Sequence, residues 1–181
     1  MVTHPSILLI EDSPGECELF RLALAQTGLT VALHTEQDAD AALRFLDHLA
    51  ANIPGCSHGE AAGVVSTARV ERAHSDRARS ASTETMPAVS PSLILLDLNL
   101  RGQDGCDFLK RLRSDLRFST IPTIVFTTSD DLTDVARCYT SGANGYVIKP
   151  GTFTELVQCI GDICHYWLTR HRVPHMIETP C

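Results

Sequence analysis

Short apolar runs alternate along this chain with segments in which apolar residues recur every three or four positions. The runs at residues 6–10, 93–96, 123–126 and 145–148 are almost uninterrupted, which is typical of strands buried on both faces of a sheet. A shorter run at residues 30–33 predicts one more strand. The pattern therefore indicates five strands separated by helices.

Five segments have helical spacing. The first begins at Ser13-Pro14, where a serine N-cap precedes a proline at the first helical position, and it ends at Gly28. The others are predicted from 39 to about 50, from 105 to about 115, from 130 or 131 to just before 142, and from 153 to 167. The expected buried faces include Leu116 in the third helix and Val135, Ala136 and Tyr139 in the fourth.

The order of these elements predicts the fold class. Continuous apolar strands that alternate with helices indicate a parallel sheet with helices on both faces. With right-handed crossovers, five such strands commonly adopt the order 2-1-3-4-5. We therefore predict an α/β, flavodoxin-like, doubly wound five-stranded parallel sheet, with a long insertion between the second helix and the third strand.

The insertion covers residues 52–91. It is rich in Ala, Ser, Gly and Arg, and it contains no aromatic residue. Because it offers little apolar surface to bury, we expect it to be disordered, with a short helix around 65–79 as the alternative. The last residues, 171–181, contain two prolines and are predicted to form a coil tail.

Composition excludes several classes of protein. A net charge of −7 over 181 residues argues against a nucleic-acid partner, which would need a basic patch. No apolar stretch is long enough to span a membrane, and the N-terminus does not resemble a signal peptide. The seven cysteines are odd in number and do not have the spacing of a metal site. We expect a reduced, cytoplasmic protein.

Charged residues follow three of the predicted strands. Glu11 and Asp12 come after the first strand, Asp97 after the third, and Lys149 after the last. In an open parallel sheet the carboxyl ends of the strands line one crevice, where ligands bind. Three carboxylates and one ammonium group in such a crevice suit a divalent metal ion and a phosphoryl group.

Four segments resemble the receiver domain of two-component response regulators. They are ILLIEDSPGE, LILLDLNLRGQDG, IPTIVFTTS and ANGYVIKP. The resemblance covers residues 1–170 apart from the insertion. The EDSPGE opening, the LDLNL core and the aromatic pair Tyr166-Trp167 are most similar to small single-domain regulators paired with phytochrome-type histidine kinases.

The resemblance implies the residues of the reaction. Asp97 matches the phosphoacceptor, and Lys149 matches the lysine that contacts the phosphoryl group. Glu11 and Asp12 match the acidic pair that supports Mg²⁺, and Asn99 matches the position whose backbone carbonyl completes the metal site. The implied cofactor is therefore Mg²⁺.

The resemblance also implies two switch residues. Thr127 matches the hydroxyl switch, although Thr128 is an adjacent competitor, and Tyr146 matches the aromatic switch. One position departs from the family pattern, because Arg101 stands where a proline is common. That difference could alter a turn or kinase recognition, but it removes no reactive group.

We therefore expect a single-domain response regulator that accepts a phosphoryl group on Asp97 from a sensor histidine kinase. It would catalyse its own phosphotransfer and dephosphorylation, and it would not be a metabolic enzyme. Its output would be protein contact or homodimerisation through the last helix–strand–helix face, since no DNA-binding domain follows in the sequence. One alternative is an adaptor of the same fold that works without phosphorylation. Another is a Mg²⁺-dependent phosphatase, which Asn99 disfavours because that class needs an aspartate there.

Overall fold

The computed structural model describes residues 5–51, 90–100 and 102–172. Its centre is a sheet of five parallel strands in the order β2-β1-β3-β6-β7. The strands are β1 (Ser6–Ile10), β2 (Ala32–Glu36), β3 (Leu93–Leu96), β6 (Thr123–Thr127) and β7 (Gly145–Ile148). This confirms the predicted fold class and the predicted order, since β6 and β7 are the expected fourth and fifth strands.

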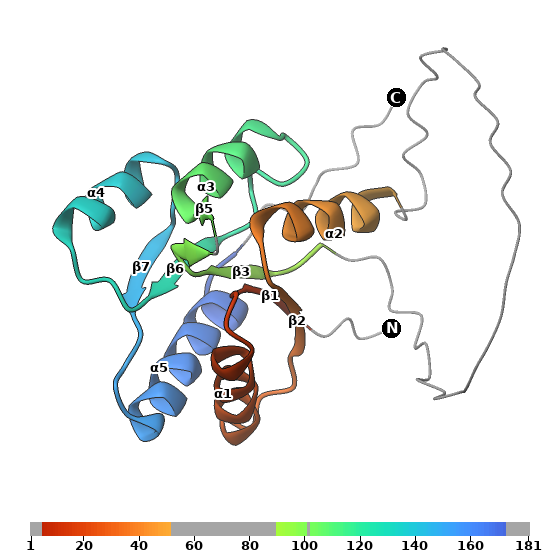
Figure 1. The fold of residues 1–181 in the computed structure, drawn as a ribbon. Helices are drawn as coiled ribbons and strands as arrows, with labels where there is room; N and C mark the ends of the chain where they lie inside the picture. Colours follow the sequence, from red (N-terminus) through yellow and green to blue (C-terminus); the bar gives the residue numbers. More distant parts are fainter. Residues whose placement is uncertain (1–4, 52–89, 101, 173–181) are drawn as a thin grey trace, which may run out of the picture.

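Helices cover both faces of the sheet (Figure 1). One face carries α1 (Pro14–Gln26) and α5 (Phe153–His165), which pack against each other. The other face carries α2 (Ala39–Ala51), α3 (Gly105–Ser114) and α4 (Leu132–Thr140). None of the helices within the described residues is long and apolar enough to cross a bilayer.

The central strands are buried on both faces, as their continuous apolar runs predict. In β1, Leu8 and Ile10 belong to the core beneath α2, α3 and α4. Ile7 and Leu9 point the other way, into the core beneath α1 and α5. Side chains alternate across a strand, so one short apolar run supplies both layers of the core.

The second strand was predicted two residues too early. The expected strand at residues 30–33 lies at Ala32–Glu36, because Ala32 pairs with Ser6 and Glu36 pairs with Ile10. Its last residues, from His34 onward, are polar. An edge strand tolerates them because only one of its sides pairs with the sheet.

Two predicted helix faces were also wrong. Leu116 is 86% exposed, because α3 ends at Ser114 and the extended Asp115 takes the chain out of helical register. Phe118 is buried instead. In α4 the buried residue is Cys138. Val135 is only half-buried, and Ala136 and Tyr139 are exposed.

Two short features were not predicted. β4 (Asn99–Leu100) and β5 (Gln103–Asp104) form a small antiparallel hairpin directly after the predicted phosphoacceptor. The closing helix ends at His165 and continues as a π-helical turn, η1 (Tyr166–Arg170). The predictions of a disordered insertion and a coil tail concern residues 52–91 and 171–181, most of which lie outside the described residues.

Candidate functional site

The end of β3 places Asp97 in a buried position, 7% exposed. The backbone N–H of Asp97 donates a 3.0 Å hydrogen bond to the carbonyl oxygen of Ile10, so the sheet ladder fixes the backbone at this point. Gly105 begins α3 directly beside it. A Cβ atom at Gly105 would lie 2.8 Å from the carbonyl oxygen of Asp97, so only glycine allows this approach.

The end of β1 places Glu11 next to Asp97. Glu11 is 2% exposed, and its backbone N–H donates to the carbonyl oxygen of Glu36 at 2.9 Å. One carboxylate oxygen accepts a 3.0 Å hydrogen bond from the backbone N–H of Ser13. Ser13 in turn caps α1, since its hydroxyl accepts from the backbone N–H of Glu16. The strand end, the carboxylate and the helix start therefore form one connected unit.

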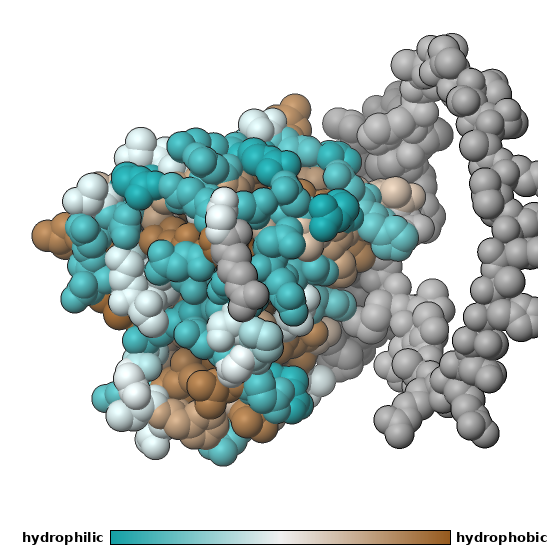
Figure 2. Space-filling view, in the orientation of Figure 1, coloured by the Kyte–Doolittle hydropathy of each residue, from teal (hydrophilic) through white to brown (hydrophobic). Residues whose placement is uncertain are grey.

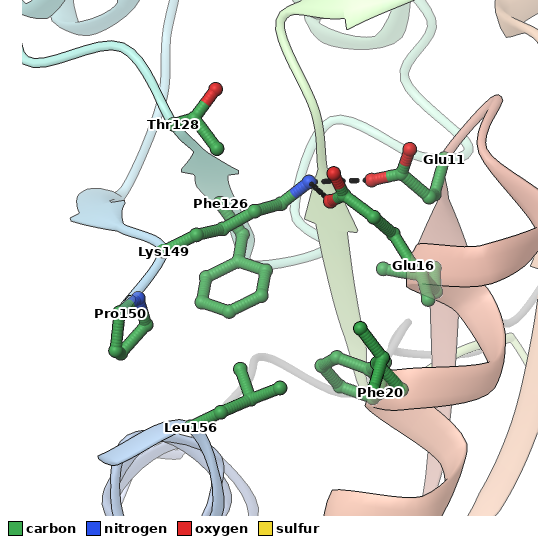
Figure 3. A pocket seen from close by; sticks show the side chains of 10 residues that line it. Glu11, Glu16, Phe20, Phe126, Thr128, Lys149, Pro150 and Leu156 are labelled. Atoms are coloured by element: carbon green, nitrogen blue, oxygen red, sulfur yellow. Dashed lines mark hydrogen bonds and ion pairs between the residues drawn. The ribbon is translucent and has the colours of Figure 1, made fainter. Parts of the chain in front are cut away.

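Lys149 reaches both carboxylates across the sheet, and Figure 3 shows its contacts with Glu11 and with Glu16. Its Nζ donates to Glu11 Oε2 at 2.6 Å and to Asp97 Oδ2 at 3.2 Å. A third contact goes to the Glu16 carboxylate, which extends from α1. The side chain of Lys149 is only 10% exposed, so its ion pairs with Glu11 and Asp97 are largely shielded from water.

Burial and charge act together on the ionisation of these groups. Burial raises the pKa of Glu11 above its ordinary value, although the hydrogen bonds from Lys149 and Ser13 oppose the rise. For Lys149, burial lowers the pKa, but the hydrogen bonds with Glu11 and Glu16 and the charge of Asp97 outweigh it and hold the pKa above its usual range. Lys149 is therefore a permanent ammonium group in this site.

The other two predicted metal residues lie at the edge of this group. Asp12 is half-buried just after β1, next to Glu11. Asn99 has an exposed side chain, and its backbone N–H donates to Asp97 Oδ1 at 3.4 Å. The oxygen-donor group that the structure brings within 4.8 Å consists of Glu11, Glu16 and Asp97.

This group has the chemistry of a divalent metal site. All three residues are carboxylates, and oxygen ligands are those that Mg²⁺ and Mn²⁺ prefer. They share one ammonium group, so a further cation would relieve their mutual repulsion. The residues present therefore fit a hard divalent ion, with Asp12 adjacent as a further carboxylate.

The predicted switch residues lie on the neighbouring strands. Thr127 is fully buried as the last residue of β6, whereas Thr128 is exposed, which agrees with the preference for Thr127 as the candidate. The backbone carbonyl oxygen of Thr127 accepts a 2.7 Å hydrogen bond from the N–H of Lys149. The Thr127 hydroxyl accepts a 3.4 Å hydrogen bond from the N–H of Ser129. Thr127 therefore contacts both the lysine and the loop that follows β6.

Tyr146 is connected to the same loop. It lies half-buried on β7, packs against the core beneath α4, and donates from its hydroxyl to the carbonyl oxygen of Ser129 at 3.0 Å. Burial raises the pKa of Tyr146, so the hydroxyl stays protonated as a donor. Ser129 also donates to Asp134 on α4 at 2.8 Å. Loop, strand and helix are thereby hydrogen-bonded to one another.

Sequence reasoning did not identify Glu16 or Gly105 as part of this site. In the sequence Glu16 stands near the start of the first helix, where the helix dipole favours an acid whether or not it has a partner. Gly105 was interpreted only as the start of α3. No local pattern marks either residue, because each acquires its role from a partner on another element.

The comparisons with known proteins agree with this geometry. The protein-family model of the response regulator receiver domain matches residues 65–161 of this chain. That match leaves out β1 and its acidic pair, which precede the insertion. The structure nevertheless pairs β1 with β3, from Ile7–Leu93 to Ile10–Leu96, so the N-terminal strand completes the same domain.

Two relatives extend the similarity to almost the whole chain. The probable methanogenesis regulatory protein FilR2 of Methanothrix harundinacea is 30% identical over 93% of this chain and 86% of its own length. Response regulator Rcp1 of Synechocystis sp. is 28% identical over 93% of this chain and 92% of its own length.

Solved structures confirm the fold. The crystal structure of the phosphorylated cyanobacterial phytochrome response regulator RcpA aligns with a TM-score of 0.69 at 26% identity, covering 96% of this chain and 100% of that one. The Mn²⁺-bound form of response regulator Rcp1 aligns with a TM-score of 0.66 at 27% identity, covering 94% and 99%. Receiver domains accept a phosphoryl group, bind divalent metal at an acidic pocket and interact with histidine kinases. This chain belongs to the response regulator receiver family.

Proposed function

We propose that Asp97 is the phosphoacceptor of a single-domain response regulator. The observation that carries this proposal is the buried Asp97 carboxylate at the end of β3, 3.2 Å from the Lys149 ammonium and beside the Glu11 carboxylate. A buried carboxylate with a fixed ammonium and a second acid is poorly explained as a cap or a turn residue. It is well suited to receive a phosphoryl group.

The proposed reaction is nucleophilic. A carboxylate oxygen of Asp97 attacks phosphorus, the bond from phosphorus to the imidazole nitrogen of the kinase phosphohistidine breaks, and the imidazole takes up a proton. Lys149 offers its positive charge to the phosphoryl oxygens. The Thr127 hydroxyl, at the end of the neighbouring strand, can donate a hydrogen bond to the same oxygens. The product is an acyl phosphate on Asp97.

We propose that the cofactor is Mg²⁺, held by the carboxylates of Glu11, Asp12 and Asp97 and by the backbone carbonyl of Asn99. When bound, the ion would supply positive charge against the negative charge of the phosphoryl group. The residues themselves orient Asp97, exclude water through their burial and keep Lys149 charged. The acidic group around Asp97 and the Mn²⁺-bound form of the relative Rcp1 support this choice.

The proposed partner is a sensor histidine kinase of the phytochrome type. The support is that RcpA, one of the similar structures, is a phytochrome response regulator. The wider alternatives are histidine kinases that respond to other signals. A cytoplasmic location and the absence of a nucleic-acid partner remain predictions.

The proposed output is a change in the face formed by α4, β7 and α5, read by a protein partner or by a second copy of the chain. Thr127 and Tyr146 both bond to the loop after β6, so a phosphoryl group that moved Thr127 would move this loop and shift the population of α4 positions. These elements already expose large hydrophobic side chains, among them Leu132 (81%), Tyr139 (51%) and Ile148 (50%). Exposed apolar side chains of this kind often mark a protein interface.

The test of the phosphoacceptor is intact-mass measurement after incubation with Mg²⁺ and acetyl phosphate. We expect the wild type to gain one phosphoryl group and Asp97→Asn to gain none. An unmodified wild type that still binds Mg²⁺ would overturn the proposal and favour a phosphorylation-independent adaptor.

The test of dimerisation is light scattering after size exclusion, with and without the phosphodonor. We expect the phosphorylated protein to shift toward a dimer and Ile148→Arg to prevent the shift. Leu22→Arg, at a similarly exposed position on α1, is the matched control and should dimerise normally. A shift lost in Leu22→Arg but kept in Ile148→Arg would place the interface elsewhere.

A further inference from the structure

Glu16 contacts the reactive lysine from outside the predicted set of site residues. It stands in the first turn of α1, and its carboxylate extends from this helix to Lys149 Nζ (Figure 3). The Glu16 side chain is 42% exposed, whereas those of Glu11 and Asp97 are 2% and 10% exposed. Glu16 is therefore the outermost of the three carboxylates around this ammonium group.

The hydrogen-bonding capacity of Lys149 is already filled. An ammonium group carries three N–H donors. Lys149 Nζ has three carboxylate partners within hydrogen-bonding distance, Glu11, Glu16 and Asp97. A phosphoryl oxygen can bind this ammonium group only if one of the carboxylates gives up its contact.

The three contacts differ in what else their carboxylates must do. If Asp97 is the phosphoacceptor and Glu11 supports the metal ion, as proposed above, both already belong to the reaction. The proposed function gives Glu16 neither role, although Glu16 belongs to the group of three carboxylates that fits a divalent ion. It is also the only one of the three that comes from a helix and can turn outward into water, since it is the most exposed.

We propose that Glu16 is a positioning residue that holds the Lys149 ammonium on the α1 side of the pocket and competes with the incoming phosphoryl group for it. The inference rests on the proposed function and adds that Glu16 slows the phosphorylation of Asp97. The Glu16 carboxylate lowers the effective positive charge that Lys149 presents. It also places a negative charge at the rim of the site, where an anionic phosphodonor must pass.

The proposal predicts the effect of removing only the charge. Glu16→Gln keeps the size of the side chain, so we expect the apparent second-order rate constant for phosphorylation by acetyl phosphate to rise about three- to fivefold, the range of a partly exposed ion pair. Glu16→Asp keeps the charge and should stay nearer to the wild type. Glu18→Gln, two residues along the same helix and paired with Arg21, is the matched control and should leave the rate unchanged.

A second phosphodonor of different charge distinguishes charge competition by Glu16 from a structural effect of the substitution. Acetyl phosphate is a dianion at neutral pH, whereas phosphoramidate is a monoanion. Glu16→Gln should therefore accelerate the reaction with acetyl phosphate more than the reaction with phosphoramidate. A purely structural role would change both rates by the same factor, and that result would overturn the proposal.

Two further outcomes are decisive. A slower reaction in Glu16→Gln would mean that Glu16 preorganises Lys149, which contradicts competition. A loss of Mg²⁺ affinity of about tenfold or more, measured by calorimetry, would make Glu16 a metal ligand instead. A wrong phosphoacceptor assignment would be distinguished from a wrong role for Glu16, because the wild type itself would then gain no phosphoryl group.

Discussion

The hydroxyl of Tyr146 donates a 3.0 Å hydrogen bond to the backbone carbonyl oxygen of Ser129. This bond connects β7 to the loop that also contacts the buried Thr127 hydroxyl and α4. In the proposed output, it is one of the contacts through which a change at the end of β6 would reach the face of α4, β7 and α5.

Tyr146→Phe tests this connection. The substitution removes one hydrogen bond and keeps the ring, so we expect a loss of about 1 kcal/mol in the free energy of unfolding. Amide hydrogen exchange in residues 128–131 should become faster, while phosphorylation of Asp97 by acetyl phosphate should persist. Tyr139→Phe, on the exposed surface of α4, is the control. If exchange in the loop is unchanged in Tyr146→Phe, the hydrogen bond does not hold the loop.

Gly105→Ala tests the close approach of α3 to the phosphoacceptor. The new Cβ would lie 2.8 Å from the Asp97 carbonyl oxygen and 3.0 Å from the Leu98 Cα, so the backbone must move. We expect a destabilisation of about 2 kcal/mol by urea unfolding and a fall of roughly tenfold or more in the rate of phosphorylation. Gly151→Ala, where no atom lies within 4 Å, should change neither quantity. Equal effects at both glycines would refute the steric explanation.

Arg113→Ala tests the hydrogen bonds that connect α3 to the loops before β6 and β7. The guanidinium donates to the backbone oxygens of Gly142, Ser119 and Ile121 and to the side chain of Asn144. Removing it leaves the carbonyl oxygens of Gly142 and Ser119 without this donor, whereas Ile121 and Asn144 still accept from Thr123. We expect a loss of about 3 kcal/mol in the free energy of unfolding.

The control for this substitution is Arg111→Ala. Arg111 stands on the same helix and makes an exposed ion pair with Asp40. Its removal should cost about 0.5 kcal/mol, the usual size of a surface pair. Comparable losses for both arginines in urea unfolding would show that the backbone contacts of Arg113 add little.

Removal of the metal ion tests the acidic pocket. We expect excess chelator to abolish phosphorylation by acetyl phosphate, and added Mg²⁺ or Mn²⁺ to restore it, because the carboxylates alone repel the donor. Asp12→Asn should lower Mg²⁺ affinity about tenfold or more in calorimetry, as expected for loss of a carboxylate ligand. Asp38→Asn, just before α2, is the control. Undiminished phosphorylation in chelator would show that Lys149 alone supplies enough positive charge.

Alkaline pH tests the buried thiol of Cys164. Burial raises the pKa of this thiol from 9.0 to about 11 in the folded protein. A raised pKa stabilises the folded state below the unfolded value, and that contribution is lost as the pH rises through the folded value. The free energy of unfolding should therefore fall by roughly 2 kcal/mol between pH 9 and 11 because of this group. Cys164→Ala should show a smaller fall over the same range in urea unfolding, and an identical fall would exclude the thiol.

Part of this molecule could be predicted because it depends on short-range patterns. The continuous apolar runs of β1, β3 and β6 are strands because only a sheet covered on both faces can bury every one of their residues. The run of β7 lies at the edge of the sheet and is only partly buried. Ser13 is a helix cap because its hydroxyl bonds to an N–H three residues away. The positions of Glu11, Asp97 and Lys149 followed from the same logic, since each comes directly after a strand whose end was evident.

The errors came where a pattern competed with tertiary contacts. The strand at Ala32–Glu36 contains His34, Thr35 and Glu36, so its polar half has no apolar signal. Leu116 continues the helical spacing of α3, but the helix ends two residues earlier and Phe118 takes its place in the core.

The sequence by itself therefore determined the fold class, the strand order and the crevice where the carboxylates and the lysine would meet. Only the tertiary structure decided which carboxylates actually share that lysine. Glu16 and Lys149 are 133 residues apart, and no local spacing relates them. They meet because α1 packs against the sheet to which β7 belongs. The interaction of two charges depends on their distance in space and not on their separation along the chain.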